Sequence, residues 1–342
     1  MVTHLALSNP ASFSQPDEAP LLPLLLIGHG SRDPEGQTEF LKLAATYQAA
    51  TPHRPIFPCF LELTDPSIAD GIQRCLEAGY QEVIALPVLL FGARHNKYDV
   101  TLELDRWQQI YPQLKLHYGG PLGIRNDILD LLRQRLVHLQ DQHPQIAAAE
   151  TVLLFVGRGS SDPEANGEAC KLARMVWEGS GYASVETCFI GITHPRLSVG
   201  FARALLLKPR RLIVIPYFLF TGVLLKKIEQ DTQQQRQQHP EVEFYLLPEI
   251  GIHPTVLTGL WEREQEAIAG TTPMNCHLCK FRRAVATQTL ASSGHLHHPT
   301  DPHDHDAHSH PHPHRHAHPH SHASVDVYER EADYHQKIWQ VP

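Results

Sequence analysis

The sequence predicts an α/β protein built from two tandem copies of a small parallel-sheet domain, with a cleft between the copies. The first observation is a repeat: residues 24–35 read LLLIGHGSRDPE and residues 153–164 read LLFVGRGSSDPE. The same offset of 129 residues relates further pairs, namely Pro87 and Pro216, Phe91 and Phe220, and Lys97 and Lys226. The second observation is that strand and helix signals alternate within each copy, as in parallel sheets covered by helices.

The first strand is the clearest element of the first copy. The run Leu24–Gly28 is continuously apolar and is bounded by Pro23 and Gly28, which is typical of a parallel strand buried on both faces. The pattern then predicts, in order, a helix at Gly36–Ala50, a strand at Ile56–Leu63, a helix at Pro66–Ala78, a strand at Glu82–Leu90, a helix at Asn96–Ile110, a strand at Leu114–Tyr118 and a helix at Asn126–Gln140.

The second copy repeats this alternation. We predict strands near Val152–Val156, Val185–Ile190, Arg211–Pro216 and Glu243–Leu247, with helices between them and a final helix at Thr255–Ala269. Each copy is therefore expected to be a four-stranded α/β domain.

The chain of 342 residues is long enough for two domains of roughly 130 residues, each with its own core. We expect a disordered leader at 1–20, an N-terminal domain at 21–145, a C-terminal repeat at 150–270, a cysteine-containing segment at 271–285, a disordered histidine-rich segment at 286–324 and a terminal segment at 325–342.

Composition excludes several classes of protein. The formal net charge of −8 argues against a nucleic-acid-binding surface, where a basic stripe is expected. No apolar run reaches the ~18–20 residues that span a bilayer, and Leu21–Ile27 lacks the basic flank of a signal peptide. Six cysteines in a chain of this length do not resemble a disulfide framework, so we expect a reducing, cytoplasmic location.

The two copies differ at three chemically important positions. His29 becomes Arg158 in the second copy; the other two changes are Glu62 to Gly191 and His95 to Leu224. Each of the first-copy residues can bind a metal ion or move a proton. Their absence from the sister copy indicates that the fold does not require them.

Equal spacing places these three residues together. His29 and Glu62 are 33 residues apart, as are Glu62 and His95, which matches one strand–helix unit and the next strand. All three are therefore expected at the carboxyl ends of neighbouring strands, where open parallel sheets bind ligands. The alternative is that His29 caps its turn and Glu62 is a solvated strand end. Two imidazoles and a carboxylate favour a site for a first-row divalent metal, and the same groups can act as bases.

Other residues at this edge suggest an anionic ligand. The turn at Gly28–Ser31 has glycines that can cradle a phosphate, but it matches neither known nucleotide-binding spacing, and the second copy keeps the glycines. Arg32, Arg94 and Lys97 flank the predicted metal site and form a basic group in an acidic protein. The alternative for each of them is a solvated surface residue.

The C-terminal part carries two further metal-related signals. Cys276 and Cys279 form half of a tetrahedral thiolate site, and a redox disulfide, a zinc site shared between chains and an iron–sulfur cluster bridging two subunits all remain open. In residues 295–322, 13 of 28 positions are histidine, which indicates metal affinity without specifying the metal.

Together these motifs resemble a known family. The GHGSRD turn containing His29, with Glu62 and His95 at equal spacing on a duplicated α/β domain, is similar to the class II chelatases of the sirohydrochlorin type (the CbiX/SirB family), whose fold is chelatase-like or flavodoxin-like. The Met-x-Cys-x-x-Cys element and the histidine-rich tail resemble the long form of this family. The resemblance covers Leu24 to about His322.

The resemblance implies ATP-independent insertion of a divalent metal into sirohydrochlorin in the cleft between the copies. The implied metal is Co²⁺, for cobalamin synthesis, with Fe²⁺ (sirohaem synthesis) or Ni²⁺ as alternatives. His29, His95 and Glu62 would hold the metal, and Cys276 and Cys279 an iron–sulfur cluster. The substrate carries eight carboxylates, for which Arg32, Arg94, Lys97 and Arg158 are the expected partners.

Two rival interpretations follow from the same residues. A non-catalytic cobalt or nickel store explains the histidine-rich segment but not the single-copy residues His29, Glu62 and His95. A ferrochelatase explains all of them. We expect no nucleic-acid or membrane partner, and a monomer, or a dimer if a cluster bridges two chains.

Overall fold

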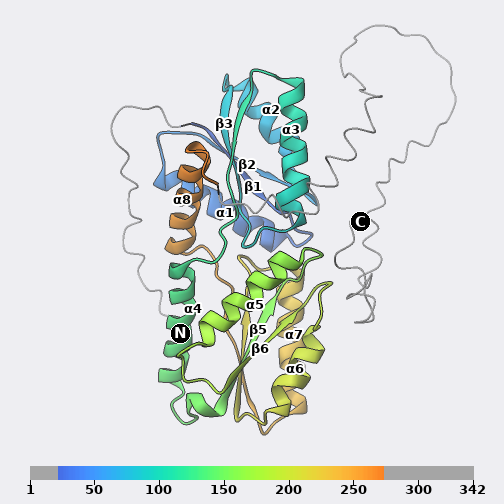
Figure 1. The fold of residues 1–342 in the computed structure, drawn as a ribbon, viewed down its shortest axis with the longest axis vertical. Helices are drawn as coiled ribbons and strands as arrows, with labels where there is room; N and C mark the ends of the chain where they lie inside the picture. The colour runs from blue at the N-terminus through green and yellow to red at the C-terminus, as the bar shows by residue number, and fades with distance from the viewer. Residues whose placement is uncertain (1–21, 273–342) are drawn as a thin grey trace, which may run out of the picture.

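The computed structural model of the chain describes residues 22–272 and consists of two four-stranded parallel sheets, one from each copy of the repeat (Figure 1). The first sheet has the strand order β2-β1-β3-β4 and the second the order β6-β5-β7-β8. The strands of the first sheet are β1 (Leu24–Gly28), β2 (Ile56–Phe60), β3 (Glu82–Pro87) and β4 (Lys115–Tyr118). Those of the second are β5 (Thr151–Gly157), β6 (Ser184–Phe189), β7 (Arg211–Pro216) and β8 (Glu243–Leu246). The predicted α/β class with two parallel sheets is confirmed.

Helices follow each strand. They are α1 (Pro34–Ala50), α2 (Ile68–Glu77), α3 (Val100–Ile110), α4 (Asn126–Gln142), α5 (Pro163–Trp177), α6 (Leu197–Leu206), α7 (Val223–Gln238) and α8 (Pro254–Ile268). A π-helical segment at His95–Asp99 precedes α3. No helix in residues 22–272 combines the length and apolar character needed to cross a membrane.

Two helices are exchanged between the halves. Helix α4, which follows the first sheet, lies along the second half, where Arg133 donates to the carbonyl of Met175 in α5 and Leu136 accepts from the Tyr182 hydroxyl. Helix α8, which ends the second copy, lies in the first half and packs on β3 and β4 (Figure 1). The boundaries predicted at 145 and 150 separate the two sheets, whereas the helices that cover them are shared.

A buried ionic cluster holds α8 on the first half. The Glu264 carboxylate accepts from the Arg54 guanidinium at 2.5 Å and from the Tyr47 hydroxyl at 2.6 Å. All three residues are buried, and Glu264 has no exposed surface. Burial raises the pKa of Glu264, and the charge of Arg54 and its hydrogen bond counteract that rise. Tyr47 and Arg54 belong to the first copy and Glu264 to the last helix, so the cluster ties the two copies together.

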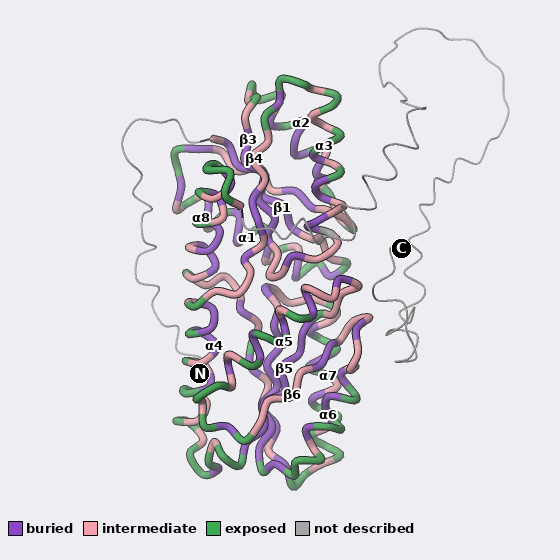
Figure 2. Tube along the Cα trace, viewed as in Figure 1, coloured by how far each residue is buried: buried purple, intermediate pink, exposed green. Residues whose placement is uncertain are grey.

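One core cluster contains residues of both halves, and Figure 2 shows buried residues along β1 and β5. Alternate residues of β1 face opposite sides: Leu24 and Leu26 belong to this shared core, while Leu25 and Ile27 belong to a separate core under α2 and α3. The second sheet has its own outer core under α6 and α7. The exchanged helices α4 and α8, together with α1 and α5, therefore cover the two inner faces of the sheets.

Several predicted boundaries shift for local reasons. Helix α1 begins at Pro34 and not at Gly36, because the Asp33 side chain caps the Glu35 amide and proline suits the first helical position. The helix predicted as one piece at Asn96–Ile110 contains the π-helical segment at its start. The predicted leader at 1–20, the cysteine pair, the histidine-rich segment and the terminal segment 325–342 lie outside the described residues.

Candidate active site

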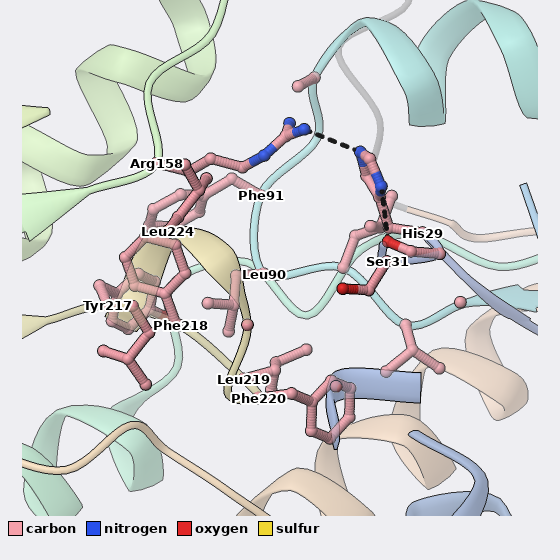
Figure 3. A pocket seen from close by; sticks show the side chains of 18 of the residues that line it. His29, Ser31, Leu90, Phe91, Arg158, Tyr217, Phe218, Leu219, Phe220 and Leu224 are labelled. Carbon is pink, nitrogen blue, oxygen red and sulfur yellow. Dashed lines mark hydrogen bonds between the residues drawn. The ribbon is translucent and has the colours of Figure 1, made fainter. Parts of the chain in front are cut away.

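A cavity of ≈ 410 Å³ lies between the two halves, at the carboxyl ends of the central strands (Figure 3). It is lined by the loops that follow β1, β3, β5 and β7 and by the first turns of α1 and α5. The cleft predicted between the copies is therefore present, and its walls come from equivalent loops of both repeats.

His29 lies on the wall formed by the loop after β1. Its Nδ1 is 3.3 Å from the Gly30 carbonyl oxygen and 3.7 Å from Oε1 of Glu62. Its Nε2 is 2.9 Å from Nη2 of Arg158, which reaches across from the second half (Figure 3). The structure thus brings together His29, its predicted partner Glu62 and its sequence counterpart Arg158.

Backbone pairing fixes the position of Glu62 relative to His29. The Glu62 amide donates to the His29 carbonyl at 3.1 Å. Gly30 adopts a φ of +94°, and a Cβ added there would lie 1.7 Å from the Glu62 carbonyl oxygen. Only glycine fits both conditions. The second copy keeps the same pairing, since the Gly191 amide donates to the Arg158 carbonyl at 2.8 Å.

The third predicted ligand, His95, is the first residue of the π-helical segment, and its side chain lies outside those that the structure describes. Among the described side chains, no group of three His, Cys, Asp or Glu residues has a metal-binding arrangement. The described part of the predicted metal site is therefore the pair His29 and Glu62.

The four predicted substrate-binding cations occupy different surroundings. Arg32 and Arg158 line the cavity and are exposed. Arg94 is half-buried, with its Nε 3.9 Å from Oδ2 of Asp99 and its guanidinium over the Tyr98 ring.

Lys97 is buried and joins the two halves. Its Nζ lies 2.8 Å from Oδ2 of Asp162 and also pairs with Glu164, both at the start of α5. Burial alone lowers the pKa of Lys97, but hydrogen bonds to the two carboxylates outweigh this and raise it. Its contacts are thus with protein carboxylates, and a part in substrate binding stays a prediction.

A second ion-pair group mirrors the first at the repeat offset of 129 residues. Lys226 Nζ lies 2.7 Å from Oδ2 of Asp33 and 3.0 Å from Oε2 of Glu35, at the start of α1. The hydrogen bond from Lys226 lowers the pKa of Asp33. These reciprocal ties explain why the repeat keeps both the Asp-Pro-Glu sequence and the lysine.

One wall of the cavity is apolar and comes mainly from the loop after β7. The Tyr217 ring lies 5.1 Å from that of Phe91, measured between centroids, and 5.5 Å from that of Phe155. The remaining members of this wall that Figure 3 labels are Leu90, Phe218, Leu219, Phe220 and Leu224. Sequence reasoning did not single out these residues as part of the site, although the repeated Phe91 and Phe220 were a signal. The cavity thus combines a polar edge with an apolar, aromatic-rich wall.

Comparison with known proteins gives this arrangement a family. The sequence model of the CbiX family matches twice, at residues 23–139 and 152–267. The chain belongs to the CbiX family. Each match covers one sheet of the fold, so the chain carries two CbiX repeats, and the family resemblance inferred from His29, Glu62 and His95 is confirmed.

Curated relatives include enzymes named for two different metals. A sirohydrochlorin cobaltochelatase of Priestia megaterium is 37% identical over 264 residues, covering 77% of this chain and 85% of the relative. A sirohydrochlorin ferrochelatase of Bacillus subtilis (strain 168) is 31% identical over 250 residues, covering 72% of this chain and 92% of the relative.

Solved structures agree with this fold. SirB from Bacillus subtilis with Fe³⁺ superimposes with a TM-score of 0.62 at 28% identity, covering 73% of this chain and 96% of SirB. SirB from Bacillus subtilis subspecies spizizenii in complex with cobalt gives a TM-score of 0.60 at 25% identity, with the same coverage.

Within the CbiX fold of this chain, the two repeats contribute unequal chemistry to the cavity. The first supplies the imidazole of His29, with the Glu62 carboxylate beside it, and such groups can bind a divalent metal and accept protons. The second supplies a guanidinium and an apolar wall, which can bind an anionic, flat molecule.

Proposed function

We propose that this chain is a sirohydrochlorin chelatase that inserts Co²⁺ into the tetrapyrrole without ATP. The observation that carries the proposal is that His29 lines a cavity between two CbiX repeats and has Oε1 of Glu62 3.7 Å from its Nδ1, with no equivalent pair in the second repeat. A fold that needed these residues for stability would keep them in both copies. Their restriction to one copy is expected for chemistry on one face of a substrate.

Cobalt is preferred to iron because the cobaltochelatase of Priestia megaterium is more similar to this chain than the ferrochelatases are, at 37% against 30% and 31% identity. Imidazole and carboxylate ligands suit both ions, and Ni²⁺ as well. A sirohydrochlorin ferrochelatase is therefore the second candidate function.

The cavity supports a binding mode in which the macrocycle lies against the apolar wall that includes Phe91 and Tyr217. Aromatic faces stack on flat conjugated ligands. Its carboxylates would be held by cations at the cavity edge, Arg32 and Arg158, and by Arg94 nearby. In this binding mode the ring nitrogens would face His29, beside which Glu62 lies.

The reaction exchanges one divalent metal ion for two pyrrole protons. We assign the metal ligands as His29, Glu62 and His95, the last from its sequence position. In the insertion step the metal's bonds to these side chains break and its bonds to the ring nitrogens form. The imidazole of His29 and the carboxylate of Glu62 then accept the two protons and release them to solvent. No change in oxidation state is involved.

A non-catalytic cobalt or nickel store is the candidate from another class. It needs no cavity between the repeats and no aromatic wall, both of which this chain has. An iron–sulfur cluster at Cys276 and Cys279, and a dimer bridged by it, stay predictions from the sequence.

The test is turnover of purified full-length protein with Co²⁺, Fe²⁺ or Ni²⁺ and sirohydrochlorin under anaerobic conditions, followed by the absorption spectrum of the tetrapyrrole. His29→Ala and Glu62→Gln should each lower kcat by at least about a hundredfold, because general bases contribute ~10²–10⁴-fold. Glu62→Gln keeps the shape of the side chain and should leave tetrapyrrole binding largely intact.

Glu186→Gln, on the outer strand β6 and away from the cavity, is the matched control and should retain activity. An unchanged tetrapyrrole spectrum with every metal would favour the store. Near-normal turnover in both site variants would remove His29 and Glu62 from the mechanism.

A further inference from the structure

The contact between Arg158 and His29 determines which nitrogen of the imidazole carries hydrogen. A guanidinium stays protonated in proteins and has no acceptor, so Arg158 Nη2 must donate across the 2.9 Å to Nε2 of His29. Nε2 therefore offers its lone pair, and the ring hydrogen is on Nδ1. That assignment agrees with the surroundings of Nδ1, which faces the Gly30 carbonyl and the Glu62 carboxylate.

This hydrogen bond and a metal ion on His29 exclude one another. If the metal binds Nε2, it uses the lone pair that Arg158 now occupies. If it binds Nδ1, the hydrogen of the neutral ring must be on Nε2, which then cannot accept from Arg158. Metal binding at either nitrogen therefore requires the Arg158 guanidinium to leave.

We propose that Arg158 is a latch that withholds His29 from metal ions until an anionic substrate enters the cleft. Arg158 lines the same cavity as His29 and comes from the opposite half. A carboxylate in the cavity offers it a charged, bidentate acceptor, which is a stronger partner than a neutral imidazole. Binding of the tetrapyrrole thus draws Arg158 away and frees the ring nitrogen. This role rests on the proposed chelatase function for the identity of the anion.

Repeat symmetry explains how the latch is positioned. Arg158 follows β5 in the second copy just as His29 follows β1 in the first, so the two side chains face each other across the cleft. The reciprocal ties of Lys97 and Lys226 hold the two loops in register. Arg158 therefore affects metal binding only through its contact with His29.

Energetic linkage makes the latch reciprocal. If bound tetrapyrrole increases the affinity of His29 for metal, bound metal must increase the affinity for tetrapyrrole by the same factor. Free protein then avoids occupation by metal in the absence of substrate.

The test is a Co²⁺ titration of the full-length protein without tetrapyrrole, followed by the visible absorption of the bound ion. The titration of a His29→Ala variant is subtracted as background. The histidines of 295–322 bind Co²⁺ equally in both titrations, so their contribution cancels and the difference reports the site that depends on His29. In Arg158→Met the Kd of the His29-dependent site should fall roughly tenfold, the scale of a hydrogen bond to a charged group. The KM for sirohydrochlorin should rise in the same variant, because a carboxylate partner is lost.

Arg32→Met is the matched control, since it removes an equal charge from the same cavity while leaving the contact between Arg158 and His29. Its Kd for Co²⁺ should stay within about twofold of wild type, so that equal tightening in both variants would replace the latch with a simple charge effect. Unchanged or weaker Co²⁺ binding in Arg158→Met would overturn the latch even in an active enzyme. If Arg158→Met binds Co²⁺ more tightly but the wild-type protein shows no turnover, the competition between Arg158 and metal for His29 would stand and the chelatase function would be rejected.

Discussion

The buried cluster at the exchanged helix α8 gives a quantitative prediction for Arg54→Met. Methionine fills much of the volume of arginine but removes the guanidinium that contacts Glu264 at 2.5 Å. The two side chains are 1% and 0% exposed, so the remaining carboxylate would be buried without a cation. Loss of one partner of a buried ion pair costs about 3–5 kcal/mol of unfolding free energy.

A second variant tests the cause of that loss. Arg54→Met combined with Glu264→Gln removes the stranded charge yet keeps an oxygen for the Tyr47 hydroxyl, which now lies 2.6 Å from Glu264. The double variant should therefore be about 2 kcal/mol more stable than Arg54→Met alone.

The assay is urea denaturation followed by circular dichroism, with unfolding free energies compared at constant m-value. Burial raises the pKa of Glu264 above its ordinary value of 4.5, and loss of Arg54 raises it further. A raised folded-state pKa means that the native state binds the proton more tightly than the unfolded chain. Stability is therefore gained towards low pH, and the deficit of Arg54→Met should shrink as pH falls towards 4.5. A deficit below about 1 kcal/mol at pH 7, or a double variant less stable than the single one, would refute this reasoning.

Two further predictions concern the cleft. Gly30→Ala should abolish turnover and lower stability, because φ is +94° and the new Cβ would lie 1.7 Å from the Glu62 carbonyl oxygen. Gly167→Ala is the control for both the kinetics and the denaturation midpoint, since a Cβ there meets nothing within 4 Å. Lys226→Met should lower the denaturation midpoint at neutral pH. The hydrogen bond from Lys226 depresses the pKa of Asp33 below 3.8, so this effect should begin to shrink near pH 3.8 and disappear once the pH lies well below the depressed value. A midpoint difference that persists at pH 2 would show that Lys226 acts through packing and not through its charge.

The sequence predicted the sheets well because their signals are local. Leu24–Gly28 and Arg211–Pro216 have the predicted bounds, since an apolar run flanked by proline or glycine has few alternatives. The end of β2 was less predictable: its chain continues through Leu61 and Glu62 in a paired but irregular segment that sequence alone does not distinguish from strand.

The helix exchange was not predictable from these patterns. The apolar face of α4 shows that the helix is half-buried, but the same face can pack on either sheet. Deciding between them requires long-range partners such as Met175 and Tyr182, which no local periodicity specifies.

In the candidate site, the repeat identified His29 and Glu62 because chemistry survives in only one copy. The same comparison of the two copies could have suggested the ion pair of Lys97 with Asp162. Both residues have counterparts at the repeat offset of 129 residues, Lys226 and Asp33, and these also form an ion pair. The contact of Arg158 with His29 was likewise implied by pseudo-twofold symmetry, but only the placement of the halves brings the two side chains to 2.9 Å.

The crossing of α4 and α8 limits how this protein can be divided or opened. A fragment containing only the first copy would keep α4, which packs on the second sheet, and would lose α8, which packs on its own sheet. The inner face of its sheet would then be exposed, so the two fragments should fold only when mixed. Each half contributes one long helix to the other half, and rigid separation would expose part of the inner face of both sheets at once. We therefore expect the cleft to open by a small rotation of the two halves about α4 and α8. A wide hinge opening, which is common in two-lobed proteins, is disfavoured.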